Sequence, residues 1–307
     1  MYSNTNNAFS NTALNTTGKQ LKDKTAASKD YFQLFLGGGT TLEKVSIQSF
    51  FETQLTLANK ASLGATASAG MTGSYLDGTS KRLFAANGLE PQQVFLKGMM
   101  GASFMDQIVN NYLSKNKLDE GTNRINNTNK VLEDSKTYTT MEHTWDEAYG
   151  YIYGADGTKF WSDYIDEVKA DINLAFRTGR AAIVANDYAT RDTQIDIIKA
   201  KIALVPAVRA VFYLQEGKSK LTTDKGAKAF HALSEAYGFI ISLRYTNKPG
   251  TNNPYFTKAE VDAMLANMVS GTNGLWDIDT LGAKLDTISV QIATKFGFTV
   301  TQAATVN

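Results

Sequence analysis

The sequence of 307 residues contains no cysteine, four prolines and two histidines. The absence of cysteine excludes disulfides, thiolate nucleophiles, cysteine-ligated zinc and iron–sulfur clusters. It fits a reducing cytoplasm and an envelope compartment equally well. The scarcity of proline leaves most of the chain able to form long helices.

The sequence also lacks a strong charge of one sign and long apolar runs. It has 31 basic and 30 acidic residues, a net charge of +1 and no long block of either sign. We therefore expect no nucleic-acid partner. No stretch approaches the roughly 20 apolar residues that cross a bilayer, so we expect no transmembrane segment. The usual signatures of P-loop enzymes, serine hydrolases and zinc proteases are absent.

The spacing of apolar residues predicts an all-α fold with at least ~60% helix, against roughly a third in an average soluble protein. Residues 61–80 are rich in Gly, Ser and Thr, so we expect a loop or a broken helix there, and a polar loop at 119–130. Pro206 predicts a kink. The predicted helices are 21–36 (ended by the glycines at 37–39), 42–63, 90–113, 138–153, 160–185, 188–214, 224–245, 257–269 and 280–296.

The polar residues 1–28 predict a poorly ordered leader, which resembles the mature N-terminus of a processed protein. The remaining length suits one or two domains. We predict two related helical bundles, at 29–155 and 156–307.

A repeated motif supports this division. HTWDEAYGY at 143–151 and HALSEAYGF at 231–239 both fit H-x-x-x-E-A-Y-G-[YF] and contain the two histidines of the chain. Each copy is followed by F-x-x-x-x-[IV]-D, at 160–166 and 256–262. An internal duplication is the simplest explanation.

The motif places metal-ligating side chains on one helix face. Residues four apart on a helix lie one above the other, so His143 is next to Glu147 and His231 is next to Glu235. Imidazole and carboxylate together can bind iron or another divalent metal. We predict that the two helices pack about a pseudo-twofold axis and share one metal centre. Asp146 would add an oxygen ligand from the first copy.

Two other interpretations of the motif stay open. The His–Glu pairs can simply satisfy each other in the core, where the small Ala and Gly of the motif let a neighbouring helix approach and bury the carboxylates. The aromatic residues Trp145, Tyr149 and Tyr237 are predicted to contact a ligand, although aromatics at helical spacing are also typical of a core.

The segments KGMMGASFMDQIVNNYL (97–113), EHTWDEAYGYIYG (142–154) and SEAYGFIISLRY (234–245) resemble the DUF4856 family of bacterial envelope proteins, common in Bacteroidetes, which in turn resembles the imelysin-like, iron-regulated proteins. The resemblance implies two related helical bundles in an exported, often lipid-anchored protein linked to iron uptake. In the imelysin motif G-x-H-x-x-E, His143 matches the histidine, Asp146 takes the place of the glutamate, and Met141 takes the place of the glycine.

The sequence and the resemblance together predict an exported, non-catalytic protein that binds a metal ion or a metal-bearing small ligand through the His/Glu centre. The alternatives are a metal-dependent peptidase with Glu147 as general base and a structural surface protein in which the motifs only pack.

Overall fold

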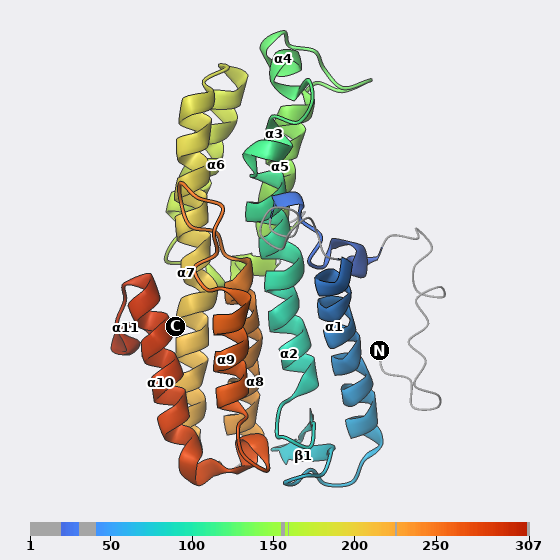
Figure 1. The fold of residues 1–307 in the computed structure, drawn as a ribbon, viewed down its shortest axis with the longest axis vertical. Helices are drawn as coiled ribbons and strands as arrows, with labels where there is room; N and C mark the ends of the chain where they lie inside the picture. Colours follow the sequence, from blue (N-terminus) through green and yellow to red (C-terminus); the bar gives the residue numbers. More distant parts are fainter. Residues whose placement is uncertain (1–19, 31–40, 155–156, 159, 225, 306–307) are drawn as a thin grey trace.

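The computed structural model describes residues 20–30, 41–154, 157–158, 160–224 and 226–305. It is 68% helical, which confirms the all-α prediction. Within the described residues, the only sheet is an antiparallel hairpin of β1 (Gly73–Asp77) and β2 (Ser80–Phe84) at one end of an elongated molecule (Figure 1).

The described helices fall into three groups: longer α-helices, short α-helices, and π- and 3-10 helices. The longer α-helices are α1 (Thr41–Leu63), α2 (Pro91–Met99), α5 (Thr140–Tyr153), α6 (Lys169–Val184), α7 (Tyr188–Lys220), α8 (Ala227–Ser242), α9 (Lys258–Met268) and α10 (Ile278–Phe296). The short ones are α3 (Lys115–Leu118), α4 (Asn123–Thr128) and α11 (Val300–Ala304). The π-helices are η3 (Met100–Met105) and η4 (Ile108–Tyr112), and the 3-10 helices are η1 (Leu21–Lys24), η5 (Phe160–Tyr164), η6 (Leu243–Tyr245) and η7 (Gly274–Trp276).

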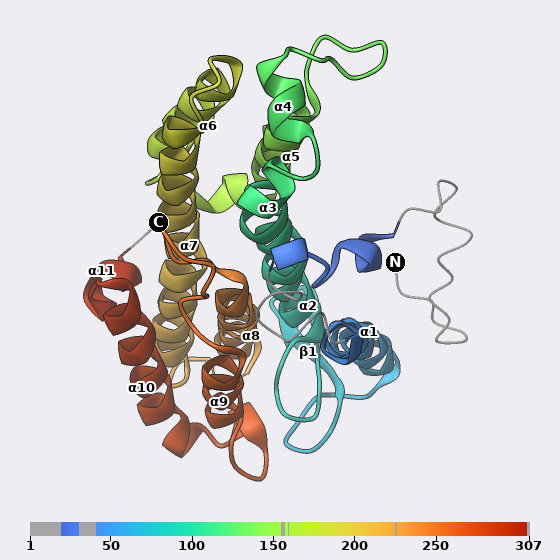
Figure 2. The same cartoon turned by 45° about the horizontal axis from the view of Figure 1, so that its top comes forward.

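Two long helical rods organise the molecule. The first is α7, which packs against α6, α8 and α10. The second is α2, which continues through η3 and η4; α8 packs on its first part and α5 on its last part. Figures 1 and 2 show α5 beside α3 and α4 at one end of the molecule, and α8 beside α9 nearer the other.

The motif helices α5 and α8 therefore do not pack against one another. The prediction of a pseudo-twofold pair is wrong, because each motif helix packs on a different part of the second rod. The internal duplication itself stays a prediction. The helix pairs α2–α8 and α5–α6 both cross the boundary predicted between residues 155 and 156.

Three local predictions differ from the structure. Part of 61–80 forms the hairpin, whose tight turn follows Asp77 with Gly78 at φ 59°; Asp-Gly is a known hairpin signal. Part of 119–130 forms α4. Residues 31–36 and the glycines at 37–39 lie outside the described part of the chain.

The end of the predicted leader is packed rather than loose, while residues 1–19 lie outside the described part. Thr25, Ala26 and Ser28 are buried. The Ser28 backbone N–H and hydroxyl donate to the Asp106 carboxylate at 2.9 and 2.5 Å. This segment is thus anchored to the second rod.

Candidate functional site

Helix α5 carries the first motif copy between two well-defined ends. Thr139 caps its start: the Thr139 hydroxyl oxygen accepts a hydrogen bond from the Glu142 N–H at 3.3 Å. In return, the Glu142 carboxylate accepts one from the Thr139 N–H at 2.6 Å. This reciprocal capping box fixes where the helix begins. Gly154, at φ 68°, ends it.

The exposed face of α5 carries His143 and Glu147. Their side chains are 43% and 41% exposed, and Nε2 of His143 lies 3.6 Å from Oε1 of Glu147. The imidazole stacks on the Tyr138 ring, with 5.1 Å between ring centroids. No further charged group pairs with either side chain in the part of the chain that the structure describes. Both are therefore available to a ligand.

An open groove of about 560 Å³ lies along this face. We call it the histidine groove. It runs between α5, η3 and the packed end of the N-terminal segment. Its lining consists of Leu21, Lys24, Phe104, His143, Asp146, Glu147, Gly150, Tyr151 and Gly154.

Asp146 faces this groove but is already paired. The Arg180 Nε donates to its two carboxylate oxygens at 3.1 and 3.2 Å, and Arg180 Nη1 donates to Glu142 Oε1 at 2.7 Å. Burial opposes ionisation of Glu142, but the Thr139 N–H and Arg180 outweigh it and hold the pKa of Glu142 below its usual value. Arg180 thus competes for the Asp146 oxygens that were predicted to bind metal.

The second motif copy has a different environment. Nδ1 of His231 lies 2.6 Å from Glu90 Oε2 and 2.7 Å from Arg82 Nη1, and Nε2 lies 3.7 Å from Glu235 Oε2. Arg82 also pairs with Asp77, at 2.7 Å between Nη2 and Oδ2. His231 is therefore held in an ion-pair network that ties the hairpin to α2 and α8.

Glu235 continues this network on the other side. It is 11% exposed and lies 3.2 Å from Nζ of Lys97. Lys97 also donates to the Tyr164 hydroxyl at 2.5 Å. Burial opposes the charge on Lys97, but Tyr164 and Glu235 outweigh it, and the pKa of Lys97 is raised. A metal ion at His231 and Glu235 would have to displace these partners.

The predicted shared centre is absent. Within the described residues, no three or more His, Asp or Glu side chains are grouped so that they could hold a metal ion. The four motif side chains form two separate pairs because α5 and α8 occupy different parts of the fold. Whether either pair binds a metal by itself stays a prediction.

The motif glycines show the same asymmetry. A Cβ at Gly238 would lie 2.5 Å from Cβ of Lys97, so this glycine permits the close packing of α8 on α2. A Cβ at Gly150 would have no neighbour within 4 Å in the described part of the chain. The expected close packing at the small motif residues is confirmed in α8. In α5 it holds for the buried Ala148 but not for Gly150.

The three predicted ligand-binding aromatics also differ from one another. Trp145 is buried, and its Nε1 donates to the Phe176 carbonyl at 3.0 Å, so it is a core residue. Tyr237 is partly buried; burial, and then the nearby Asp262, raise its pKa to about 12. Tyr149 is 40% exposed and lines a second groove, between α5 and α6, of about 740 Å³.

A family model described as a domain of unknown function, DUF4856, matches residues 1–299. The chain belongs to the DUF4856 family. No curated protein and no solved structure matches this DUF4856 protein. None of its described helices is long and apolar enough to cross a membrane.

Two features of this DUF4856 protein were not predicted from its sequence. One is Asp106, a carboxylate with no exposed surface inside a π-helical rod; an Asp among apolar residues at 104–109 was the available signal. The other is the α6 side of the second groove, with Asn173 and Arg177. No local pattern marks these residues, because their neighbours come from α5.

Proposed function

We propose that this DUF4856 protein is a non-catalytic binding protein whose ligand contacts the exposed face of α5. The observation that carries the proposal is the contrast between the two motif copies. In α8, His231 and Glu235 are engaged by Arg82, Glu90 and Lys97. In α5, the same motif presents an exposed His–Glu pair on an open groove.

The ligand favoured by this pair is a metal ion that keeps ligands of its own. One imidazole nitrogen and one carboxylate can occupy two coordination positions of iron or another divalent metal. Two protein ligands alone hold such an ion weakly, so a metal-bearing small molecule fits better than a bare ion. A role in metal acquisition, as the imelysin resemblance implies, follows from this ligand class.

Titration of the protein with ferric citrate, ferrous ion and zinc tests the proposal. We expect His143→Ala and Glu147→Gln to abolish metal binding. His231→Ala is the matched control: it should keep binding, but lower the free energy of unfolding by ~3 kcal/mol because it breaks a largely buried ion-pair network. Binding that survives in His143→Ala, or no binding by the parent, would remove the proposed site.

A structural surface role is the second candidate, favoured by the His231 network. It predicts that both histidine variants lose stability and that no metal raises the melting temperature of the parent. The peptidase alternative is not favoured, since a catalytic metal usually has three protein ligands and an open position, and the described residues offer no such group.

We further propose that the protein works outside the cytoplasm and carries a lipid anchor ahead of the given chain. The resemblance to envelope proteins supports this placement, and the absence of cysteine is compatible with it. Fractionation of the native host, with labelling by a radioactive fatty acid, tests it. Recovery of unlabelled protein in the cytoplasmic fraction would contradict both parts.

A further inference from the structure

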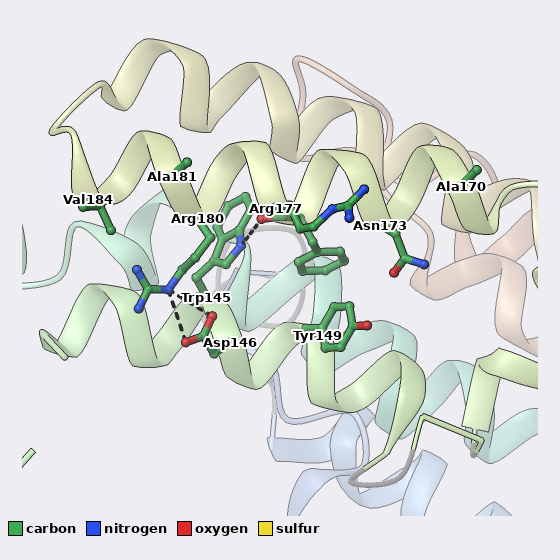
Figure 3. Close-up of a pocket in the computed structure, with 10 residues that line it drawn as sticks. Trp145, Asp146, Tyr149, Ala170, Asn173, Arg177, Arg180, Ala181 and Val184 are labelled. Atoms are coloured by element: carbon green, nitrogen blue, oxygen red, sulfur yellow. Dashed lines mark hydrogen bonds and ion pairs between the residues drawn. The ribbon is translucent and has the colours of Figure 1, made fainter. Parts of the chain in front are cut away.

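The groove between α5 and α6, which we call the tyrosine groove, has a rigid floor (Figure 3). Trp145 donates from Nε1 to the Phe176 carbonyl across the two helices. Opposite it, Gly179 has no side chain, and a Cβ there would lie 2.2 Å from the Trp145 ring. The helices therefore cannot close further, and the groove is formed before any ligand arrives.

The α6 wall of this groove contains an acceptor without a donor. Oδ1 of Asn173 is buried and has no hydrogen-bond partner among the residues that the structure describes. Most buried polar atoms are paired, and an unpaired one costs free energy. A ligand that donates a hydrogen bond to Asn173 would remove this cost.

The same wall contains a cation without a counterion. Arg177 is exposed, and it has no ion pair or hydrogen bond with any residue that the structure describes. Its neighbour Arg180, one helical turn away, is instead neutralised by Glu142 and Asp146. Figure 3 shows Arg177 on the same stretch of the groove as Asn173 and Tyr149. An arginine fork at this place suits a carboxylate.

The opposite wall presents a fixed aromatic ring. The Tyr149 ring packs edge-on against Phe176, with centroids 5.3 Å apart, and against Tyr153 at 4.5 Å. Tyr149 is still 40% exposed. It therefore offers a ring face or edge to a ligand without first having to be ordered.

We propose that the tyrosine groove binds a saccharide that carries a carboxylate, of the uronic-acid type. The sugar ring packs its C–H face on Tyr149, and Arg177 binds the carboxylate. The Asn173 side chain turns toward the groove, so that its buried Oδ1 accepts a hydrogen bond from a sugar hydroxyl. A simple aromatic acid lacks the hydroxyl donor, and a neutral sugar lacks the partner for Arg177. The site is separate from the His143–Glu147 pair and goes beyond the proposed metal function.

Three soluble probes test this assignment by NMR titration: glucuronate, glucose and benzoate. We expect glucuronate to shift resonances of α5 and α6 with a Kd on the order of 1 mM or tighter. Glucose and benzoate should each bind roughly tenfold more weakly, because each loses one polar interaction to a charged or buried group. Equal binding of glucose would contradict the carboxylate, and equal binding of benzoate would contradict the sugar.

Substitutions in the tyrosine groove test this site separately from the His143–Glu147 pair. Arg177→Gln and Asn173→Leu should each weaken glucuronate binding by roughly tenfold or more. Lys81→Gln, which removes an exposed cation in the distant hairpin, is the charge-matched control and should leave binding unchanged. His143→Ala should also leave it unchanged, so the metal proposal and this one fail independently. No shift with glucuronate, or equal shifts in Arg177→Gln, would overturn the inference.

Discussion

Glu147 and Glu235 hold the same position in two copies of one motif, and each follows its histidine by one helical turn. Their surroundings differ: Glu147 is 41% exposed and Glu235 is 11% exposed. Glu235 has Lys97 as a partner, which offsets the cost of burying its charge. At the scale of the residue, function depends on which partners the fold supplies.

Asp106 shows how burial alone changes the chemistry of one residue. Burial raises the pKa of Asp106 from 3.8 to about 6, although the Ser28 hydroxyl, the Ser28 N–H and Asn110 donate to it and act in the opposite direction. The folded state therefore binds the Asp106 proton more tightly than the unfolded state. The stability due to Asp106 is complete below about pH 3.8 and is lost as the pH rises through about 6.

We predict that Asp106→Asn removes this dependence. The parent should lose about 3 kcal/mol of unfolding free energy relative to the variant between about pH 3 and about pH 7, because a carboxylate must ionise inside the rod. Urea unfolding of both proteins at several pH values measures the difference. A difference that is constant with pH would show that Asp106 keeps its ordinary pKa.

At the scale of the element, two helical glycines have opposite roles. Gly179 lies where α6 meets Trp145 of α5, and a Cβ there would be 2.2 Å from the indole ring. Gly150 lies on the exposed face of α5, and a Cβ there would contact none of the described residues within 4 Å. Alanine has a higher helix propensity than glycine, so replacing either glycine by alanine favours the helix by itself.

We predict opposite effects of the same substitution at these two sites. Gly179→Ala should lower the unfolding free energy by ~2 kcal/mol, since overpacking outweighs the propensity gain. Gly150→Ala should raise it by ~0.5–1 kcal/mol. Chemical denaturation of the two variants beside the parent measures both. A stabilising Gly179→Ala would mean that α5 and α6 can separate without cost, which would also weaken the case for a preformed tyrosine groove.

At the scale of the whole molecule, contacts link the two predicted bundles. Helix α2 packs on α8, and α5 packs on α6. Each predicted half therefore has helices that pack against the other half. The π-helical rod joins these two packing regions in one continuous run of the chain.

We predict that the protein unfolds in a single cooperative transition. Tryptophan fluorescence reports on Trp145, Trp161 and Trp276, and far-ultraviolet circular dichroism reports on all helices. The two signals should give the same midpoint in urea, as expected for one cooperative unit, and Gly179→Ala should shift both equally. Two separate midpoints, with Gly179→Ala moving one of them, would instead support independent bundles at 29–155 and 156–307.

Local signals were sufficient for most of the helices. The capping box at Thr139 and Glu142 and the glycine at 154 give the ends of α5, because these bonds join residues within one turn. The hairpin was not predicted, because the high content of Gly, Ser and Thr at 61–80 indicated a loop. The Asp-Gly turn was not used as a signal for a hairpin. Helix α4 was missed because its residues have little apolar periodicity.

The sequence by itself determined that the chain is helical, that His143 pairs with Glu147 and His231 with Glu235, and that both pairs belong to one motif. These are consequences of helix geometry over four residues. The tertiary structure alone decided which pair is exposed. Arg82 and Glu90, which engage His231, are 149 and 141 residues away in the chain. Such partners depend on how the hairpin and the helices pack, and this packing joins surfaces that no local spacing specifies.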